Sequence, residues 1–179
     1  IAVLLSSLWL AAAPCQSESV EIPPLLVDAC FFQQDAPQVA RGFQTLDGQW
    51  QVADGVVSVG PAPGPKLVLQ DTSMSVGRVG TELFFTDKLG GNIGLLVKVS
   101  EAGVGADIWN GYEVSLYADR QVLHLARHRQ NYEPIGFFPC DVPVGQWIVL
   151  VVEMTETTLR VFVDGKLVHS YEDTEHPLA

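Results

Sequence analysis

Basic side chains are scarce in this chain. Lysine and arginine total 10 against 21 aspartates and glutamates, and the formal net charge is −11 at pH 7. An acidic protein repels the phosphate backbone of nucleic acids, so we expect no nucleic acid as a partner. Charged residues are 17% and hydrophobic residues 47% of the 179 residues, which predicts a folded chain with a sizeable core.

Cysteine is also rare. The chain has three cysteines, and no two of them stand at the Cys-x-x-Cys spacing typical of structural zinc sites. We therefore predict no metal centre of that kind. Cys15 lies at the edge of an apolar leader. For Cys30 and Cys140 two alternatives stay open: a disulfide, which an exported compartment permits, or two unpaired buried thiols.

The N-terminal apolar run is too short to cross a bilayer as a helix. Residues 1–13 have the length of a signal-peptide core, and small residues follow them. We predict a signal peptide over residues 1–17, truncated at its start because no methionine or basic segment precedes the run. The mature protein is then secreted or periplasmic and has no membrane span. A lipoprotein anchor at Cys15 is the alternative, which Pro14 fits poorly.

Helical periodicity is absent outside the leader, whereas short strands recur. Residues 18–42 are predicted to be a linker or an edge strand. Asp54-Gly55 and Asp164-Gly165 are typical hairpin turns. About ten short antiparallel strands with no repeat predict an all-β fold, an antiparallel two-sheet β-sandwich or a barrel, over residues 43–179. The chain stops after a turn, so we expect this domain to lack its last strand and the full-length chain to have room for further domains. The strands are expected at 49–53, 56–59, 66–70, 79–86, 93–99, 148–154, 157–163 and 166–171, besides a hairpin within 111–129.

The hairpin within 111–129 carries the predicted functional site. Its turn lies at Asp119 and Arg120, which pairs Ser115 with His124 and Val114 with Leu125. One face is apolar, and the other is polar enough to bind a sugar. An ordinary solvated face is the alternative, because antiparallel sheets often turn polar residues outward. The polar face carries Glu113, Ser115, Tyr117, His124 and His128.

Motifs for catalysis are largely missing. The chain has no Gly-rich phosphate loop, no Gly-x-Ser-x-Gly elbow and no cysteine in a nucleophile setting. It also lacks the Glu-Ile-Asp-x-Glu strand of laminarinase-type glucanases, so two-carboxylate glycoside hydrolysis is weakly supported. Glu113 with His124 or His128 is the predicted acid–base pair. Pairing of Glu113 with Arg127 or Arg129 is the structural alternative.

Aromatic and amide side chains surround the hairpin and are the predicted ligand-binding residues. Rings stack on the apolar faces of sugars, and amides and guanidinium groups bond hydroxyls. Trp50 and Trp147 are assigned to the core instead. No cofactor is expected; a calcium site is a weaker alternative, with Asp107, Asn110, Asp119 and Asp141 as loop candidates that form no known spacing. The predicted ligand-binding residues are Trp109, Asn110, Tyr112, Ser115, Tyr117, Arg127 and Arg129.

Several short motifs in order resemble the 3-keto-disaccharide hydrolase domain family. They are Gly48-Gln-Trp-Gln-Val-Ala-Asp-Gly55, Asn110-Gly-Tyr-Glu-Val114, Gly145-Gln-Trp147, Val161-Phe-Val-Asp-Gly-Lys166 and Tyr171-Glu-Asp173. The resemblance covers roughly residues 43–179 and is closest to copies in exported proteins of planctomycete-type bacteria. It implies a concanavalin A-like, laminin-G-like jelly roll with Tyr112-Glu113-Val114 on its concave surface. Family copies commonly have Gln where this chain has Ser115, which puts hydrolysis in doubt and leaves binding untouched.

We therefore expect an exported β-sandwich module whose partner is carbohydrate. An active hydrolase of (3-keto-)disaccharides that uses Glu113 is the enzymatic alternative. A non-catalytic adhesion or scaffolding module is the third.

Overall fold

The computed structural model describes residues 3–11, 25–30, 43–53, 56–60, 62–70, 72–88 and 90–178. These residues form strands, turns and bends, and no helix occurs among them. It follows that no described helix could span a membrane. The strands are β1 (Val3–Ala11), β2 (Leu25–Cys30), β3 (Phe43–Leu46), β4 (Trp50–Ala53), β5 (Val56–Val59), β6 (Lys66–Leu69), β7 (Gly77–Phe85), β8 (Asn92–Ser100), β9 (Asn110–Tyr117), β10 (Val122–Arg129), β11 (Tyr132–Pro139), β12 (Trp147–Met154), β13 (Thr158–Val163) and β14 (Lys166–Glu172).

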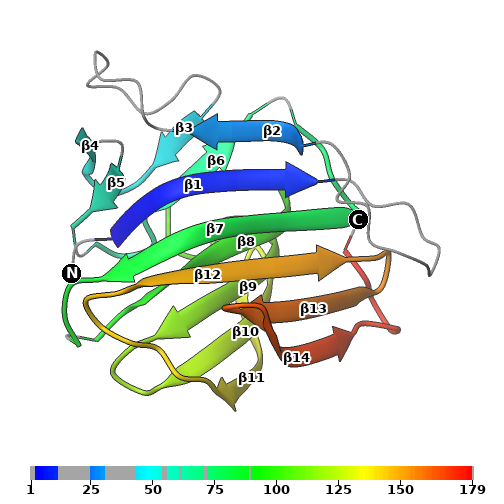
Figure 1. Cartoon of the computed structure of the whole chain (residues 1–179). Coiled ribbons are helices and arrows are strands. Elements are labelled where there is room, and N and C mark those ends of the chain that lie inside the picture. Colours follow the sequence, from blue (N-terminus) through cyan, green and yellow to red (C-terminus); the bar gives the residue numbers. More distant parts are fainter. Residues whose placement is uncertain are drawn as a thin grey trace.

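Two antiparallel sheets face each other. The larger has the order β14-β13-β12-β7-β1-β5-β4, with β2 paired to β1, and the smaller has the order β11-β10-β9-β8. Strands β3 and β6 form a separate pair. Figure 1 looks through the larger sheet, with β8 to β11 behind it. The predicted all-β, two-sheet β-sandwich is confirmed.

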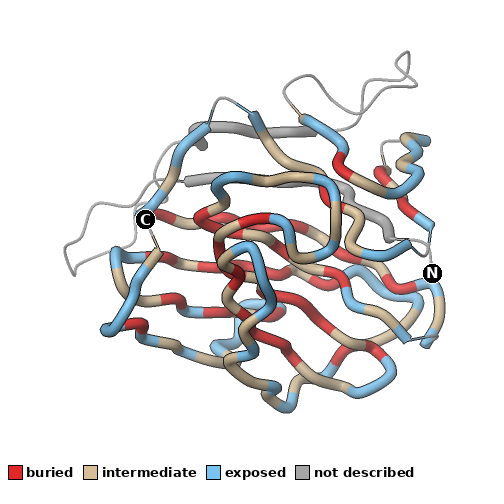
Figure 2. Tube along the Cα trace, turned by 180° about the vertical axis from the view of Figure 1, so that it is seen from behind, coloured by how far each residue is buried: buried red, intermediate tan, exposed pale blue. Residues whose placement is uncertain are grey.

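The core lies between the sheets, where alternate residues of each strand meet. Val114, Leu116, Leu123 and Leu125 of the hairpin are fully buried there. Figure 2 shows the buried segments concentrated in the middle strands of both sheets. Burial of one such side chain contributes about 1.5–3 kcal/mol, so the inward face fixes the orientation of the hairpin.

The register of the β9–β10 hairpin is the predicted one. Ser115 pairs with His124, Val114 with Leu125 and Tyr117 with Val122. The turn closes with Gln121 at a φ of 55°. Because side chains alternate along a strand, this register puts Glu113 and His124 on the face away from the leucines.

Two other segments differ from expectation, and a third agrees with one of its two alternatives. The predicted signal-peptide core forms β1, which pairs with β7 and β5. Within residues 18–42, predicted to be a linker or an edge strand, residues 25–30 form β2, which pairs with β1. The signal peptide itself stays a prediction. Strand β11 was not expected, because Pro134 and Gly136 interrupt its pattern. Trp147 was assigned to the core, yet it is 42% exposed and packs against Phe84 at the sheet surface.

Cys140 carries a free thiol, so it forms no disulfide in the structure. Burial raises the pKa of this thiol. The side chain of Cys30 lies outside the described residues. Of the two alternatives left open by the sequence, the unpaired thiol holds for Cys140.

Candidate functional site

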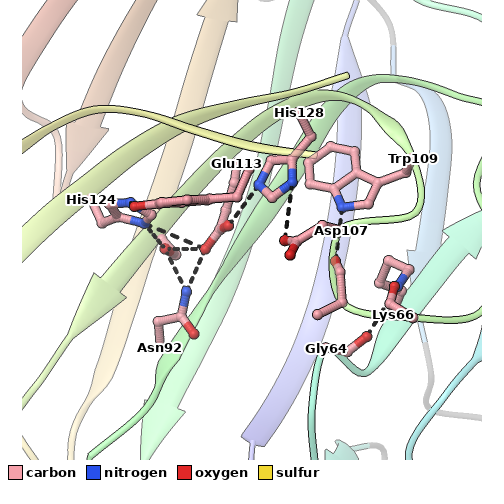
Figure 3. Close-up of polar contacts among 12 residues, drawn as sticks. Gly64, Lys66, Asn92, Asp107, Trp109, Glu113, His124 and His128 are labelled. Atoms are coloured by element: carbon pink, nitrogen blue, oxygen red, sulfur yellow. Dashed lines mark hydrogen bonds and ion pairs between the residues drawn. The ribbon is translucent and has the colours of Figure 1, made fainter. Parts of the chain in front are cut away.

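Glu113 is the centre of a polar cluster on the outer face of the smaller sheet. Its side chain is 16% exposed. One carboxylate oxygen accepts the Ser115 hydroxyl at 2.7 Å and also a bond from the Asn92 amide, and it lies 3.5 Å from His124 Nδ1. The other oxygen lies 3.2 Å from His128 Nε2. Figure 3 shows Glu113 between the two imidazoles.

These contacts hold Glu113 as a carboxylate. Burial alone would raise its pKa, but hydrogen bonds from His124, His128 and Ser115 together outweigh burial and leave the pKa well below its usual range. Glu113 is therefore a fixed acceptor at neutral pH, and it is a poor proton donor.

The proton positions around His124 follow from the Ser115 hydroxyl. That hydroxyl donates to Glu113, so it accepts from His124 Nδ1, which lies 3.2 Å away. His124 Nε2 is then free to accept from the Tyr132 hydroxyl at 3.0 Å. The His124 side chain is 3% exposed. Its hydrogen bonds to Ser115 and Tyr132 fix the orientation of the ring.

His128 joins Glu113 to the loop before β9. Its Nδ1 atom lies 3.5 Å from Asp107 Oδ1 but has no hydrogen-bond partner among the described residues. The Trp109 indole stacks on the imidazole with centroids 4.1 Å apart and donates from Nε1 to Ala106 O at 3.1 Å. Trp109 is 1% exposed. It therefore supports His128, and it also forms part of the wall of the adjoining cavity.

Exposed aromatic rings stand beside the cluster. Phe137 is 47% and Tyr132 is 39% exposed. Phe137 stacks on His124 at 4.6 Å, and Tyr117 meets Phe137 edge-on at 6.2 Å. Sequence reasoning missed Phe137 because it sits in β11, the strand that was not expected. The available signal was the group of β-prone residues Tyr132, Ile135, Phe137 and Phe138.

A cavity of about 580 Å³ adjoins the cluster. Its walls come mainly from strands β6 and β8, with residues of β3, β4, β5, β7, β9 and β12 and of the loops that precede β6, β7, β8 and β9. Lys66 is buried at this wall and donates to Gly64 O and Gly105 O at 3.1 and 2.5 Å. Burial lowers the pKa of Lys66, and nearby carboxylates oppose that shift. The lysine thus ties two loops of the cavity wall together.

Three predicted ligand-binding residues are corrected by the structure. Tyr112 is 2% exposed between the sheets and donates to Asp173 at 2.8 Å. Arg127 donates to Asp173 and Glu133, each at 2.7 Å, and Arg129 donates to His176 O at 2.6 Å. All three lie on the face of the smaller sheet away from Glu113, and all three bond the C-terminal segment.

Of the remaining predicted residues, two lie at the Glu113 cluster and one lies at the start of β9. Ser115 is buried and donates a hydrogen bond to Glu113. Tyr117 is half-buried at the edge of the cluster. Asn110 donates to Glu101 at 3.0 Å, at the start of β9. Of the calcium candidates, Asp119 pairs with Arg120 at 3.9 Å. No group of three or more carboxylate, histidine or cysteine side chains suited to a metal occurs in the described part of the chain.

Comparison with known proteins gives a likeness of fold. No family model matches the chain, and no curated protein sequence matches it significantly. Among solved structures, the carbohydrate-binding module CBM66 from Bacillus subtilis is similar, with a TM-score of 0.65 and 16% identity over 76% of this chain and 82% of that one. At this identity the likeness establishes a shared β-sandwich architecture.

Proposed function

We propose that this protein is a carbohydrate-binding module that holds a sugar on the outer face of the smaller sheet. One observation carries the proposal: a rigid cluster of sugar-bonding groups around Glu113 lies beside the exposed rings of Tyr132 and Phe137. Small-molecule sites combine a few well-placed polar groups with apolar and aromatic walls. The likeness to a carbohydrate-binding module supports the same assignment.

Binding is favoured over hydrolysis by the surroundings of Glu113. Glycosidases normally need two carboxyl groups that flank the scissile bond. Asp107 is near, but the His128 ring lies between the two carboxylates and contacts both. In addition, the lowered pKa of Glu113 makes it a weak general acid. The arrangement suits a fixed acceptor for sugar hydroxyls.

The proposal also includes a protein family and a cellular compartment. The motifs around Tyr112-Glu113-Val114 support a relationship to the 3-keto-disaccharide hydrolase domain family. The apolar N-terminal run supports export to the periplasm or the outside of the cell.

A glycan array followed by calorimetry tests the proposal. We expect Phe137→Ala to weaken the binding of the selected glycan by about tenfold, because a stacking face is lost. Trp147→Ala is the matched control, since Trp147 is equally exposed but lies on the larger sheet, and it should bind as the parent does. A blank array would favour a scaffolding module. Turnover of a 3-keto-glycoside that Glu113→Gln abolishes would replace binding with hydrolysis.

A further inference from the structure

We infer that the sugar carries an apolar substituent, which enters the cavity behind Glu113. The inference rests on the proposed function and adds the class of ligand: an uncharged aryl or short alkyl glycoside. It is carried by the lining of the cavity, which includes both residues of the polar cluster and side chains of the core.

Strand β8 contributes residues of both its faces to the cavity wall. Its partner β9 places Leu96 opposite Glu113 and Leu95 opposite Val114, so the two faces of β8 can be assigned. Residues of both faces line the cavity, Asn92 and Gly94 on the outer side and Ile93 and Leu95 on the core side. The cavity therefore passes the edge of β8, from the outer face into the space between the sheets.

The lining of the cavity joins polar and apolar side chains. Glu113, Ser115 and Asn92 belong to the outer face of the smaller sheet. Val79 of β7, Met154 of β12 and Met74 of the loop before β7 also line the cavity, and we call their part of the wall the inner end. Val79 and Met154 belong to the hydrophobic core, and Met74 packs against it. Sugar hydroxyls placed against these side chains would lose their hydrogen bonds to water without replacement.

The volume fits a ligand larger than one sugar ring. Sites for drug-sized ligands are about 300–1,000 Å³, and this cavity of about 580 Å³ falls within that range. An apolar group in the inner end gains affinity through the removal of its surface from water. Lys66 and Lys98 also line the cavity, but each ammonium group already donates to two backbone carbonyls, so an uncharged ligand suits the inner end.

Methionine labelling tests the inference directly. The chain has two methionines, and both line the cavity, so a ¹³C-methyl-methionine NMR spectrum reports on the inner end alone. We expect the phenyl β-glycosides of glucose, galactose and xylose to include one that binds at least about tenfold more tightly than its methyl glycoside. We also expect that phenyl glycoside to shift both methionine signals, while the methyl glycoside shifts them less.

Two loop variants keep the test independent of folding. Met74→Trp fills the inner end and should remove the preference for phenyl glycosides. Val76→Trp, in the same loop but outside the cavity wall, should preserve it. Equal affinities for phenyl and methyl glycosides, both reduced by Phe137→Ala, would overturn the inference and leave the proposed function standing. Absence of binding by any glycoside or array glycan would overturn both.

Discussion

At the scale of single residues, Glu113 shows how partners set the behaviour of a buried acid. Its carboxylate is surrounded by donors from Ser115, Asn92, His124 and His128. The pKa of Glu113 in the folded protein therefore lies below the value of about 4.3 for an unfolded glutamate. The bonded carboxylate contributes stability above that pH, and the contribution is lost as the pH falls through the folded pKa.

Glu113→Gln should thus change both the stability and its pH dependence. At pH 7 we expect the free energy of unfolding to fall by about 1–3 kcal/mol, because buried donors lose a charged acceptor. Urea unfolding at pH 7, 5 and 3 should show a smaller loss of stability with acid in the variant than in the parent. Glu175→Gln, at an exposed position, is the control. Parallel pH profiles for parent and Glu113→Gln would contradict this account.

Tyr112 separates a structural role from a binding role. Burial raises its pKa to about 12, so the phenol stays protonated and donates to Asp173. Tyr112→Phe leaves Asp173 and the Leu178 amide short of a partner, and it should cost about 1–3 kcal/mol in unfolding free energy. Glycan affinity measured by calorimetry should be unchanged, whereas a loss of affinity would restore Tyr112 to the site.

At the scale of elements, the β13–β14 hairpin depends on its turn. Asp164 and Gly165 have φ values of 48° and 75°, the left-handed conformation of a tight hairpin turn. A Cβ atom added at Gly165 would meet nothing within 4 Å, so substitution there carries only a conformational cost. Gly60 offers the same open space with an ordinary backbone conformation.

We therefore predict different outcomes for two alanine substitutions. Gly165→Ala should lower the free energy of unfolding by about 1–2 kcal/mol, the cost of a left-handed L-residue. Gly60→Ala should leave it nearly unchanged. Thermal unfolding of both variants is the measurement, and equal losses would show that the turn conformation is not what stabilises the hairpin.

At the scale of the whole molecule, the segment after β14 links both sheets. His176 N donates to Asp173 at 3.1 Å, and Arg129 of β10 donates to His176 O. Lys98 of β8 donates to Leu178 O at 2.9 Å and to Glu156 O, in the turn between β12 and β13, at 2.7 Å. The segment closes the end of the sandwich where these strands meet.

Removal of residues 174–179 should therefore destabilise the fold without affecting the site. Each lost hydrogen bond contributes about 1 kcal/mol, so we expect a loss of about 2–4 kcal/mol in urea unfolding. Glycan affinity of the folded fraction should be retained, because Glu113 and its partners lie on the outer face of the sheet. A shortened chain as stable as the parent would show that the segment only rests on the sandwich.

The sequence by itself determined which residues of the hairpin share a face. Side chains alternate along a strand and the turn sets the register, so Glu113, Ser115, His124 and His128 could be placed together from local pattern alone. The same rule predicted the all-β sandwich, and it put Arg127 and Arg129 on the other face from Glu113, where they bond Asp173 and His176 O.

Only the tertiary structure decided what surrounds that face. Asn92 comes from β8, Asp107 from a loop, and Tyr132 and Phe137 from β11, and each reaches the cluster through contacts between strands rather than through local spacing. The burial of Trp109 and Tyr112 and the course of the cavity also depend on how the two sheets pack. Alternation says which way a side chain points but not what it meets, because its partners are set by long-range packing.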